Sequence, residues 1–312
     1  MRYLVTGGAG FIGSHIVEEL VRRNHSVVVL DDLSTGREQN LASVDSRIDF
    51  RIGSVTEPES VQSASQGVDY VIHLAARTSV PDSVENPAAT HLVNIDGTLN
   101  VLLSARDCGV KRFVFAASSA VYGEPSFLPL AESLAPDPIS PYGLSKFVGE
   151  LYGQLFTRTY GLESASVRFF NVFGPRQDPR SPYSGVLSRF MLAMQRGEPL
   201  IIYGDGEQSR DFIYVDDIVD ITLKLCEVKE AAGLVFNGGT GQRISLNQVS
   251  EFLAQITGRA VRREHLEPRK GDIRDSQADI SLSRRVLGFE PRYSFPEGLK
   301  RTWDWYRGNR LG

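Results

Sequence analysis

The stretch TGGAGFIG, residues 6–13, decides the fold. It follows the short aliphatic run YLVT and leads directly into an amphipathic helical pattern. Gly7, Gly10 and Gly13 recur at three-residue spacing, as in a strand-to-helix turn that wraps a diphosphate. One glycine allows the tight turn, the next lets the backbone approach the phosphates, and the third lets helix and strand pack closely. The free N–H groups at the helix start complete an anion site, so the stretch predicts a dinucleotide-binding unit.

An acidic residue ends the second aliphatic run, VVVL at 27–30. This residue, Asp31, lies 18 residues beyond Gly13. A carboxylate there can accept both hydroxyls of an adenosine ribose and repels a 2′-phosphate, so it favours NAD over NADP. Alternatively, Asp31 and Asp32 merely cap a turn, and Arg37 nearby compensates a phosphate.

Strand-like and helical patterns alternate along the first half of the chain. Alternation of this kind predicts an α/β fold with a Rossmann-type doubly wound parallel sheet. From about Asn171 the pattern loosens into Pro and Gly loops and then resumes, so we expect a smaller, discontinuous α/β substrate domain. The expected strands are YLVT at 3–6, VVVL at 27–30, IDFRI at 48–52, YVIHLA at 70–75, RFVFAAS at 112–118 and GLVFNGG at 233–239, and the expected helices are Phe11–Arg23, Pro87–Cys108 and Pro141–Tyr160.

The predicted domain boundaries follow from these patterns. The NAD-binding domain comprises residues 1–171 plus about 206–238, because the run at 233–239 is expected to return to the main sheet. The second domain comprises about 172–205 plus 239–312.

Composition excludes several classes of protein. The 34 basic and 38 acidic side chains give a net charge of -4 without long runs of one sign, which argues against nucleic-acid or membrane-surface binding. Cys108 and Cys226 are too few and too far apart for a disulfide framework or a thiolate metal site, and we expect no metal. With no leader in MRYLVTGG and no apolar run of about 18 residues, a cytoplasmic protein is expected.

The stretch SPYGLSK, residues 140–146, aligns a phenol with an ammonium group. Its serine and proline are a good helix cap and first position, and Tyr142 and Lys146, four residues apart, share one face of the helix. A phenol titrates near ~10, so it acts as a base at neutral pH only where positive charge stabilises the phenolate. Lys146 and an oxidised nicotinamide could both supply that charge. The alternative is a solvated ion pair of Lys146 with Glu150, beside a half-buried tyrosine.

A serine is expected to hold the substrate oxygen. The run RFVFAAS brings Ser118 to the carboxyl end of a strand, where open α/β sheets place their ligands, and Ser119 is the reserve choice. A serine at a strand end is often only a turn former. The assignment of Ser118 as the residue that binds the substrate oxygen therefore depends on the tyrosine and lysine motif.

With these motifs in place, the chain resembles the extended short-chain dehydrogenase/reductase family over essentially its whole length. The resemblance rests on TGGAGFIG, on SSAVYG at 118–123 and on YGLSK. RFFNVFGP at 168–175, SRDFIYVDDI at 209–218 and RKGDIRDSQAD at 269–279 look like substrate-domain segments of UDP-hexose 4-epimerases. The resemblance implies that bound NAD takes a hydride from C4 of the sugar while a tyrosine removes the O4 proton. The 4-keto sugar then turns and receives the same hydride on its other face.

The resemblance also implies a role for each residue of the site. Tyr142 would be the base, Lys146 would lower its pKa and hold the nicotinamide ribose, and Ser118 would bind the reacting oxygen. Asn171, Arg210 and Arg269 would hold the diphosphate, with Tyr203 near the uracil and Asp272 on its ribose. The implied cofactor residues are Gly7, Gly10, Phe11, Ile12, Gly13, Asp31, Asp32, Ser34, Gly36, Leu74, Ala75, Tyr142 and Lys146, and the implied substrate residues are Ser79, Ser118, Asn171, Tyr203, Arg210, Arg269, Asp272 and Ser276. For Arg210, the alternative is a local ion pair with Asp211.

Departures from the family pattern bear on the reaction and on the sugar. Ser119 and Ala120 stand where dehydrating or decarboxylating relatives carry acidic residues, which argues against those reactions. Ser276 stands where some epimerases carry a bulky tyrosine, and it leaves space for an N-acetyl group. HLAARTSVPDS at 73–83 also looks like epimerases that accept such sugars, so UDP-GlcNAc/UDP-GalNAc joins UDP-glucose/UDP-galactose as an expected substrate pair. Ser54 replaces a common acidic residue near the adenine, which bears on how firmly NAD is retained.

Three expectations about partners and rival functions complete the prediction. The nearest rival is a UDP-glucuronate 4-epimerase, which would share fold, cofactor and catalytic residues. From another class, the chain could be a non-catalytic dinucleotide-sensing protein, although the tyrosine, lysine and serine together favour an enzyme. The helices around 87–108 and 141–160 resemble those that form a four-helix dimer interface in relatives, so we expect a homodimer.

Overall fold

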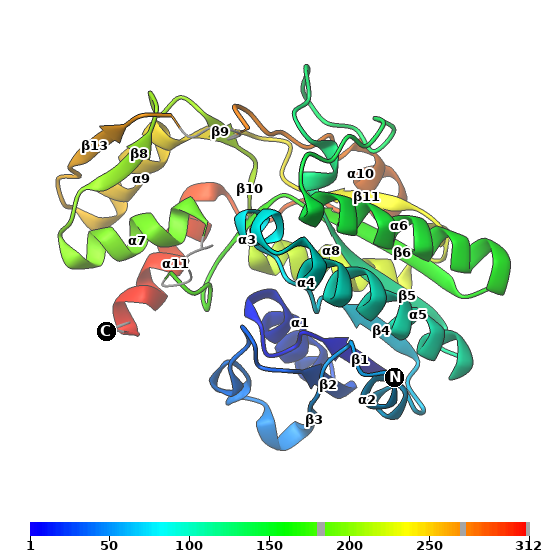
Figure 1. Ribbon diagram of the computed structural model, residues 1–312. Coiled ribbons are helices and arrows are strands. Elements are labelled where there is room, and N and C mark those ends of the chain that lie inside the picture. The colour runs from blue at the N-terminus through cyan, green and yellow to red at the C-terminus, as the bar shows by residue number, and fades with distance from the viewer. Residues whose placement is uncertain (180–184, 269–272, 310–312) are drawn as a thin grey trace.

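A seven-stranded sheet forms the centre of the molecule (Figure 1). The computed structural model describes residues 1–179, 185–268 and 273–309. The strand order is β11-β6-β5-β4-β1-β2-β3, and each neighbouring pair is parallel. The strands are β1 (Arg2–Thr6), β2 (Ser26–Asp31), β3 (Ile48–Ile52), β4 (Tyr70–His73), β5 (Arg112–Ser118), β6 (Glu163–Phe169) and β11 (Val235–Gly238). The predicted α/β class with a doubly wound parallel sheet is confirmed.

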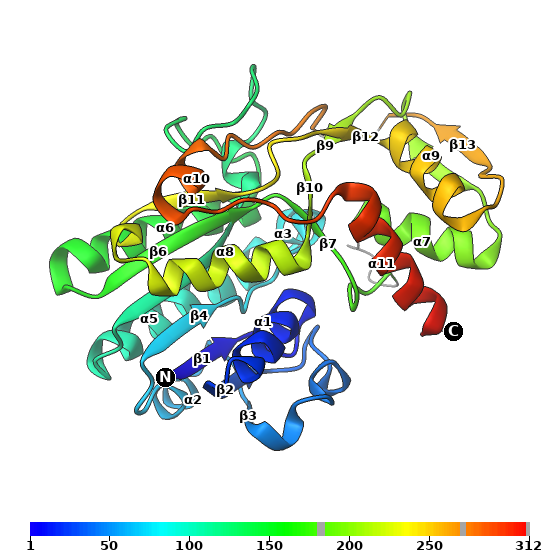
Figure 2. The same cartoon turned by 180° about the vertical axis from the view of Figure 1, so that it is seen from behind.

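Two helical layers cover the sheet because alternate strand residues face opposite sides. In β1, Leu4 packs into one apolar cluster and Val5 into the other. Figure 1 shows the molecule from the side of the layer that contains α5 and α6, and Figure 2 shows it from the side of the layer that contains α1 and α8. The helices of the two layers are α2 (Pro58–Ala64), α5 (Gly97–Asp107) and α6 (Pro141–Tyr160) on one side, and α1 (Phe11–Arg22), α8 (Val215–Glu227) and α10 (Ser281–Leu287) on the other.

The helix expected over residues 87–108 is interrupted. Its pieces are α4 (Pro87–His91), a π-helical segment over Leu92–Asp96, and α5. The short helix α3 (Val80–Glu85) precedes them. Asn94 is buried within the π-helical segment, and its side-chain Oδ1 accepts a hydrogen bond from the backbone N–H of Arg77 at 2.8 Å. The segment therefore turns an amide towards the chain that leaves β4.

One central strand, β6, was not predicted from the sequence. Its sequence, ESASVRF, places serines rather than aliphatic residues on the face towards α6. Ser164 and Ser166 are buried there, and the Oγ of Ser164 lies 3.0 Å from the hydroxyl of Thr157 on α6. A Cβ added to Gly153 would lie 3.0 Å from the same Oγ, so helix and strand are too close for larger residues. The strand is polar because α6 approaches it closely.

The second part of the molecule gathers around its own apolar cluster. This cluster includes Phe173, Met191, Leu200, Leu253 and Trp303. Its elements are β7 (Asn171–Phe173) with β10 (Phe212–Tyr214), β8 (Leu200–Tyr203) with β13 (Arg263–Leu266), β9 (Ser209–Arg210) with β12 (Ile244–Ser245), and the helices α7 (Val186–Arg196), α9 (Leu246–Thr257) and α11 (Phe295–Gly308). Figure 1 shows β8, β13, α7, α9 and α11 to one side of the sheet.

The predicted domain boundaries remain a proposal, and one element bears on them. The segment 239–312 was assigned to the second domain, but α10 within it packs against α8 and β11 of the main sheet. Its Leu287 and the following Phe289 are buried in the cluster that also contains Val5. This segment therefore contributes to the packing of both parts.

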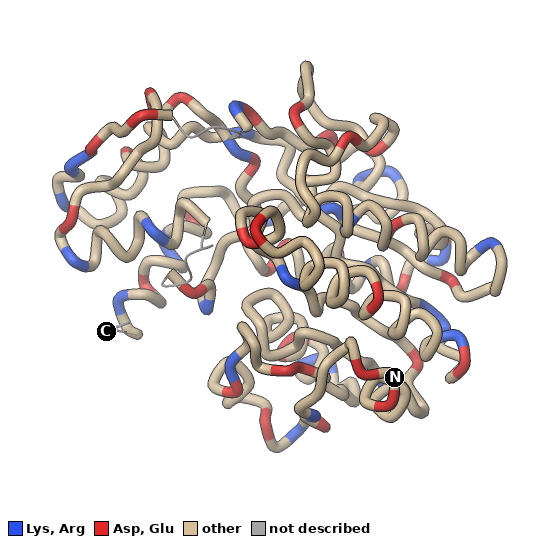
Figure 3. The backbone as a smooth tube through the Cα atoms, viewed as in Figure 1, with Lys and Arg blue, Asp and Glu red and all other residues tan. Residues whose placement is uncertain are grey.

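Charged residues of both signs are interspersed over both parts of the molecule (Figure 3). Among the described residues, no group of three or more His, Cys, Asp or Glu side chains is placed to hold a metal ion. None of the helices in the described ranges is long and apolar enough to cross a membrane.

Candidate active site

A large pocket opens at the carboxyl edge of the sheet, on the side that faces the second part of the molecule. Its volume is about 1650 Å³. The strand order reverses between β1 and β4, and open α/β sheets bind their ligands at such a switch point. The lining includes all the predicted cofactor residues, namely Gly7, Gly10, Phe11, Ile12, Gly13, Asp31, Asp32, Ser34, Gly36, Leu74, Ala75, Tyr142 and Lys146, and three predicted substrate residues, Ser79, Ser118 and Asn171.

The three glycines of the turn after β1 differ in what surrounds them. Gly7 has a φ of +70°, which suits glycine, and a Cβ there would lie 2.8 Å from the backbone nitrogen of Ala75. A Cβ on Gly13 would lie 2.2 Å from the carbonyl oxygen of Gly7, so α1 packs directly on the turn. A Cβ on Gly10 would meet that same oxygen at 3.2 Å and otherwise, among the described residues, would project into the pocket. The turn thus forms a bare backbone cradle at the start of α1, which fits a dinucleotide diphosphate.

The carboxylate of Asp31 is held in place by backbone groups. Its oxygens accept hydrogen bonds from the N–H of Ala9 and of Leu33, both at 2.9 Å. Burial raises the pKa of this carboxyl, and the two backbone hydrogen bonds oppose the rise. Asp31 does cap the local backbone, as the alternative suggested, but it also lines the pocket beside Gly36. The site therefore presents a fixed carboxylate where an adenosine ribose would lie.

Arg37 is engaged elsewhere. Its guanidinium donates a hydrogen bond to the carboxylate of Asp178, in the segment that follows β7. The arginine considered as a partner for a 2′-phosphate is thus already paired with an acidic side chain.

A buried histidine joins the glycine turn to the helical layer. His73 is 1% exposed, with Nδ1 2.6 Å from the hydroxyl of Thr6 and Nε2 3.0 Å from that of Thr98. Thr98 donates its hydroxyl hydrogen to the carbonyl of Asn94 at 2.6 Å, so it accepts from Nε2–H, and Nδ1 then accepts from Thr6. Burial lowers the pKa of His73 to about 3, and the ring is neutral. It is a structural connection beside the pocket.

The predicted catalytic residues meet in the pocket. Tyr142 and Lys146 lie on the first two turns of α6, which Ser140 caps by accepting a hydrogen bond from the N–H of Gly143 at 3.1 Å. The Lys146 Nζ lies 6.0 Å from the centre of the Tyr142 ring and donates a hydrogen bond to the Ala116 carbonyl at 2.8 Å. Ser118 ends β5 and lines the same pocket, whereas Ser119 is not among the lining residues.

Burial acts on these side chains in opposite directions. It raises the pKa of the Tyr142 phenol, and a hydrogen bond with Ser118 opposes the rise. It lowers the pKa of the Lys146 ammonium to about 8, while the Glu150 carboxylate opposes that fall. Tyr142 is therefore poised as a base only if further positive charge stabilises its phenolate, as an oxidised nicotinamide would.

The solvated pair of Lys146 with Glu150, considered from sequence, is not what the structure contains. Both side chains are buried, at 4% and 2% exposure. Glu150 instead accepts two hydrogen bonds from Arg168 on β6, at 2.9 and 2.8 Å. The acidic residue one turn beyond the lysine thus belongs to the sheet-facing side of α6.

The segment after β7 crosses the pocket and contacts α1. Arg176 donates to the carboxylate of Glu18 at 2.6 Å and to the carbonyl of Asn40 at 3.0 Å. Its backbone has a φ of +69°, which is unusual for a residue other than glycine. Sequence analysis identified this segment only as a Pro and Gly loop and missed Arg176. An arginine in such a loop was the only available indication, because its partners are far away in the sequence.

Three further predicted substrate residues do not line the large pocket. Tyr203, Arg210 and Ser276 are not among its lining residues. The Arg210 guanidinium donates to the carbonyls of Ser209 and Arg274, at 2.9 and 3.1 Å, and the backbone N–H of Ser276 donates to Ser209 at 3.1 Å. Arg269 and Asp272 lie outside the described residues. These positions remain predictions for the nucleotide end of a substrate.

The proposed local ion pair between Arg210 and Asp211 is also replaced. The Asp211 carboxylate accepts hydrogen bonds from the backbone N–H groups of Thr240, Gly241 and Ala278, at 2.8 to 3.0 Å. Asp211 therefore organises the loop after β11.

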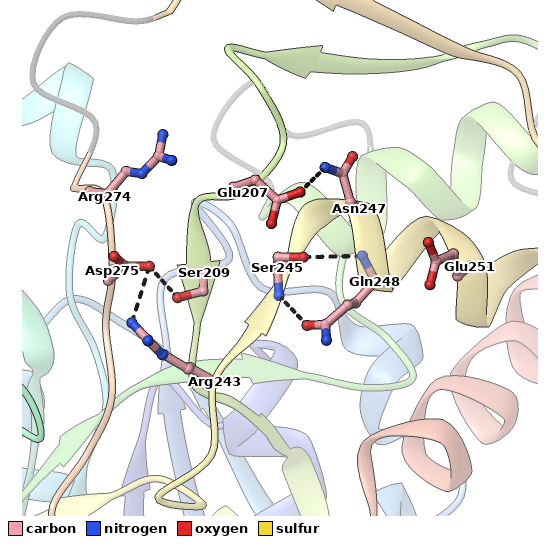
Figure 4. A pocket seen from close by; sticks show the side chains of 9 residues that line it. All are labelled: Glu207, Ser209, Arg243, Ser245, Asn247, Gln248, Glu251, Arg274 and Asp275. Atoms are coloured by element: carbon pink, nitrogen blue, oxygen red, sulfur yellow. Dashed lines mark hydrogen bonds and ion pairs between the residues drawn. The ribbon is translucent and has the colours of Figure 1, made fainter.

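A smaller pocket of about 450 Å³ lies between Ser209, Asp275 and the start of α9 (Figure 4). Its polar side chains bind one another: Asp275 contacts Arg243 and Ser209, and Asn247 donates to Glu207. At the start of α9, which lies in this pocket, Ser245 and Gln248 form a capping box, so each side chain accepts a hydrogen bond from the backbone N–H of the other residue. The other two charged side chains of the lining have partners outside it: Arg274 donates to Asp205, and Glu251 lies 4.0 Å from Arg263.

Together, a dinucleotide cradle and a Tyr–Lys–Ser group in one pocket define a protein of the short-chain dehydrogenase/reductase class. The comparisons with known proteins agree. Residues 3–239 match the profile of the NAD dependent epimerase/dehydratase family, and the chain belongs to this family.

Its relatives include several UDP-sugar 4-epimerases. The UDP-glucose 4-epimerase of Thermotoga maritima, solved with UDP-glucose, is 41% identical, with 99% of each chain covered and a TM-score of 0.94. The UDP-N-acetylglucosamine 4-epimerase of Methanobrevibacter ruminantium, solved in complex with UDP-N-acetylmuramic acid, is 38% identical, with 99% and 98% covered and a TM-score of 0.95. A UDP-glucuronate 4-epimerase of Thermodesulfobacterium geofontis is 36% identical over 318 residues, covering 98% of this chain and 96% of that one.

Proposed function

We propose that this protein is an NAD-dependent UDP-hexose 4-epimerase acting on UDP-glucose/UDP-galactose and on UDP-GlcNAc/UDP-GalNAc. One observation carries the proposal: Tyr142, Lys146 and Ser118 line the same pocket as the glycine turn. A base, a cation and a hydroxyl are thereby within one cavity with the cradle for a dinucleotide. NAD, when bound, supplies a hydride acceptor that can also return the hydride.

The roles of the three side chains follow from their chemistry. The Tyr142 phenolate takes the proton of the sugar O4 as C4 loses its hydride, which leaves a 4-keto sugar. After the sugar has turned, the hydride returns to the opposite face of C4 and Tyr142 gives the proton back to the oxygen. Ser118 hydrogen-bonds that oxygen in both half-reactions. Lys146, protonated, favours the phenolate and would bind the nicotinamide ribose.

The choice of sugar rests on Ser276 and on the relatives of this chain. Ser276 is small, and relatives named for UDP-glucose and for UDP-N-acetylglucosamine are similarly close to this chain. UDP-glucuronate is the second candidate because a relative named for that sugar is nearly as similar. It would require a group that binds a carboxylate at C6.

Proton NMR of purified protein with each UDP-sugar tests the proposal. UDP-glucose, UDP-GlcNAc and UDP-glucuronate are incubated separately, first without and then with added NAD, and the anomeric signals are followed. We expect the C4 epimers of the first two sugars. Conversion of UDP-glucuronate alone would favour the second candidate, and no conversion of any sugar with NAD present would refute the epimerase.

A further inference from the structure

The buried pair of Glu150 and Arg168 stands out because neither residue contacts the pocket. The two side chains are 2% and 4% exposed, and two hydrogen bonds join them. A buried ion pair is a poor source of stability, since removing both charges from water costs about as much as their attraction returns. Stabilisation of the contact between α6 and the sheet therefore does not by itself explain the pair.

The surroundings of Arg168 are incompletely satisfied. Among the described residues, its Nη1 finds no hydrogen-bond acceptor, and its guanidinium lies 4.6 Å from the centre of the Tyr122 ring. Tyr122 donates its hydroxyl to Asn237 at 2.7 Å, and both its ring and its hydroxyl oxygen act on Arg168. One guanidinium edge is thus committed to Glu150, and the carboxylate is fixed in position.

Glu150 lies one helical turn beyond Lys146 on the buried side of α6. Residues four apart on a helix have Cβ atoms about 5–6 Å apart. Between them, Gly149 allows the Phe115 ring to press against the helix, because a Cβ there would lie 2.3 Å from the ring. Lys146 Nζ lies 5.0 Å from the centre of that ring. The lysine, the aromatic ring and the carboxylate therefore form one dry layer under α6, in which charges act strongly on one another.

The other ionisable groups around this layer are neutral or lie towards the surface. From β4, His73 is neutral, and from the turn after β5, Tyr122 has a pKa raised by burial to about 12. Glu132, from the loop before α6, is a partly buried carboxylate whose charged form Arg168 favours, and it accepts a hydrogen bond from the N–H of Asn237 at 2.7 Å. The charged residues of the segment from α3 to α5 pair with one another instead: Arg77 with Asp82, His91 with Asp96 and Arg106 with Asp107.

We propose that Glu150, held by Arg168, is a positioning residue that keeps Lys146 protonated and thereby sets the pH at which Tyr142 becomes a base. The carboxylate acts through the lysine. Burial raises the pKa of Glu150, and the two hydrogen bonds from Arg168 oppose that rise, so Arg168 favours the charged carboxylate. The inference deepens the proposed epimerase function and rests on it for its catalytic consequence.

The test removes the carboxylate while keeping its shape. In NAD-loaded Glu150→Gln, the tyrosinate absorbance due to Tyr142, obtained by subtracting the same titration of a Tyr142→Phe form, should shift to higher pH by on the order of one unit. The acid limb of the kcat profile for the epimerised sugar should shift equally. A protein in which the pair only supports packing would show neither shift.

A matched control uses the other arginine–glutamate pair of these strands. Arg112 contacts Glu163 at 2.7 Å, where both residues begin their strands. Ala116, the partner of Lys146, lies four residues along β5, so this pair is about 13 Å away. Glu163→Gln should leave both titrations unchanged.

A second variant allows for the case in which Glu150→Gln fails to fold with Arg168 unpaired. Glu150→Gln combined with Arg168→Met leaves neither charge behind, and the titration should still shift upwards. A titration identical to that of the unaltered protein, in whichever variant folds, overturns the inference. Absence of sugar turnover in the unaltered protein would instead refute the proposed function, because the tyrosinate titration requires no sugar.

Discussion

At the scale of single residues, the pocket combines groups that burial affects in opposite ways. It raises the pKa of Tyr142 and lowers that of Lys146, so each is pushed towards its neutral form. When both groups are charged, the attraction between the phenolate and the ammonium stabilises the two charged forms. The ionisation of each group therefore depends on that of the other. The two residues therefore act as a unit, and their effects on turnover should not be additive.

Replacing the phenol tests the role of Tyr142. Tyr142→Phe should reduce kcat by about 10²–10⁴-fold, because the hydroxyl is the proposed proton acceptor, while the aromatic packing is retained. The protein should fold and keep its NAD. Turnover is measured by NMR and bound NAD by release on denaturation. Tyr160→Phe, on the same helix but exposed, is the control, and unchanged turnover in Tyr142→Phe would remove the phenol from the mechanism.

The neutral His73 predicts how stability depends on pH. Its pKa in the folded protein, about 3, lies below the ordinary value of 6.5, so between these values the unfolded chain binds a proton that the folded protein does not. The stabilisation is complete above pH 6.5 and is lost as the pH falls towards 3. It amounts to roughly 5 kcal/mol at most, since the difference of 3.5 pKa units corresponds to about 1.4 kcal/mol per unit.

Urea unfolding between pH 5 and 7.5 measures this dependence. The free energy of unfolding should fall by about 2 kcal/mol from pH 6.5 to 5 through this residue, and the fall should be smaller in His73→Gln. His91→Gln, with the histidine side chain 60% exposed, should behave like the unaltered protein. Equal slopes in all three proteins would show that His73 does not control the acid response.

At the scale of the elements, α6 has two different faces. Its inner face carries Gly143, Gly149 and Gly153, and a Cβ on any of them would come within 3.0 Å of the sheet or the turn after β5. Its outer face exposes Leu144, Leu151 and Leu155, at 50%, 46% and 42%. The neighbouring π-helical segment adds Leu92, at 52%. An apolar outer face on two adjacent helices is typical of a subunit contact.

Charge placed on this face should prevent the proposed homodimer from forming. Leu151→Glu combined with Leu155→Glu would bury two unpaired carboxylates at the contact, so we expect a monomer by light scattering. Ile52→Glu, at an isoleucine on β3 that is 67% exposed, should remain a dimer. A monomeric unaltered protein at micromolar concentration would refute the homodimer.

At the scale of the whole molecule, the pocket depends on contacts between the two parts of the chain. The segment after β7 is tied to α1 by Arg176 and to the turn after β2 by Asp178. Both segments line the pocket with the glycine turn. The second part of the molecule therefore helps to close the end of the pocket that would hold the adenosine.

Loosening this contact should weaken NAD retention. Arg176→Met removes hydrogen bonds to Glu18 and Asn40, and charged hydrogen bonds contribute about 1.5–3 kcal/mol, so NAD should dissociate roughly ten- to a hundredfold faster. The rate is measured by dilution into an NAD-scavenging enzyme. Arg284→Met removes an exposed pair with Glu290 far from the pocket and should have no effect. The same rate in both variants would show that the contact does not retain the cofactor.

The sequence by itself determined six of the seven strands of the central sheet, the glycine turn, the capped start of α6 and the class of the fold. These features are local: backbone conformation at Gly7, capping by Ser140 and the spacing of Tyr142 and Lys146 depend on neighbours within a few residues. The period of the apolar runs then places their strands in a sheet. The apolar pattern did not reveal β6, because serines rather than aliphatic residues pack against α6 on that strand.

Only the tertiary structure decided which distant side chains meet. Glu150 could have paired with Lys146 on the surface, but the docking of α6 on β6 turned it inward to Arg168. Arg176 reaches Glu18, 158 residues away, and Arg37 reaches Asp178. Such partners are selected by packing and by the need to satisfy buried charges, and these depend on three-dimensional proximity rather than on sequence spacing.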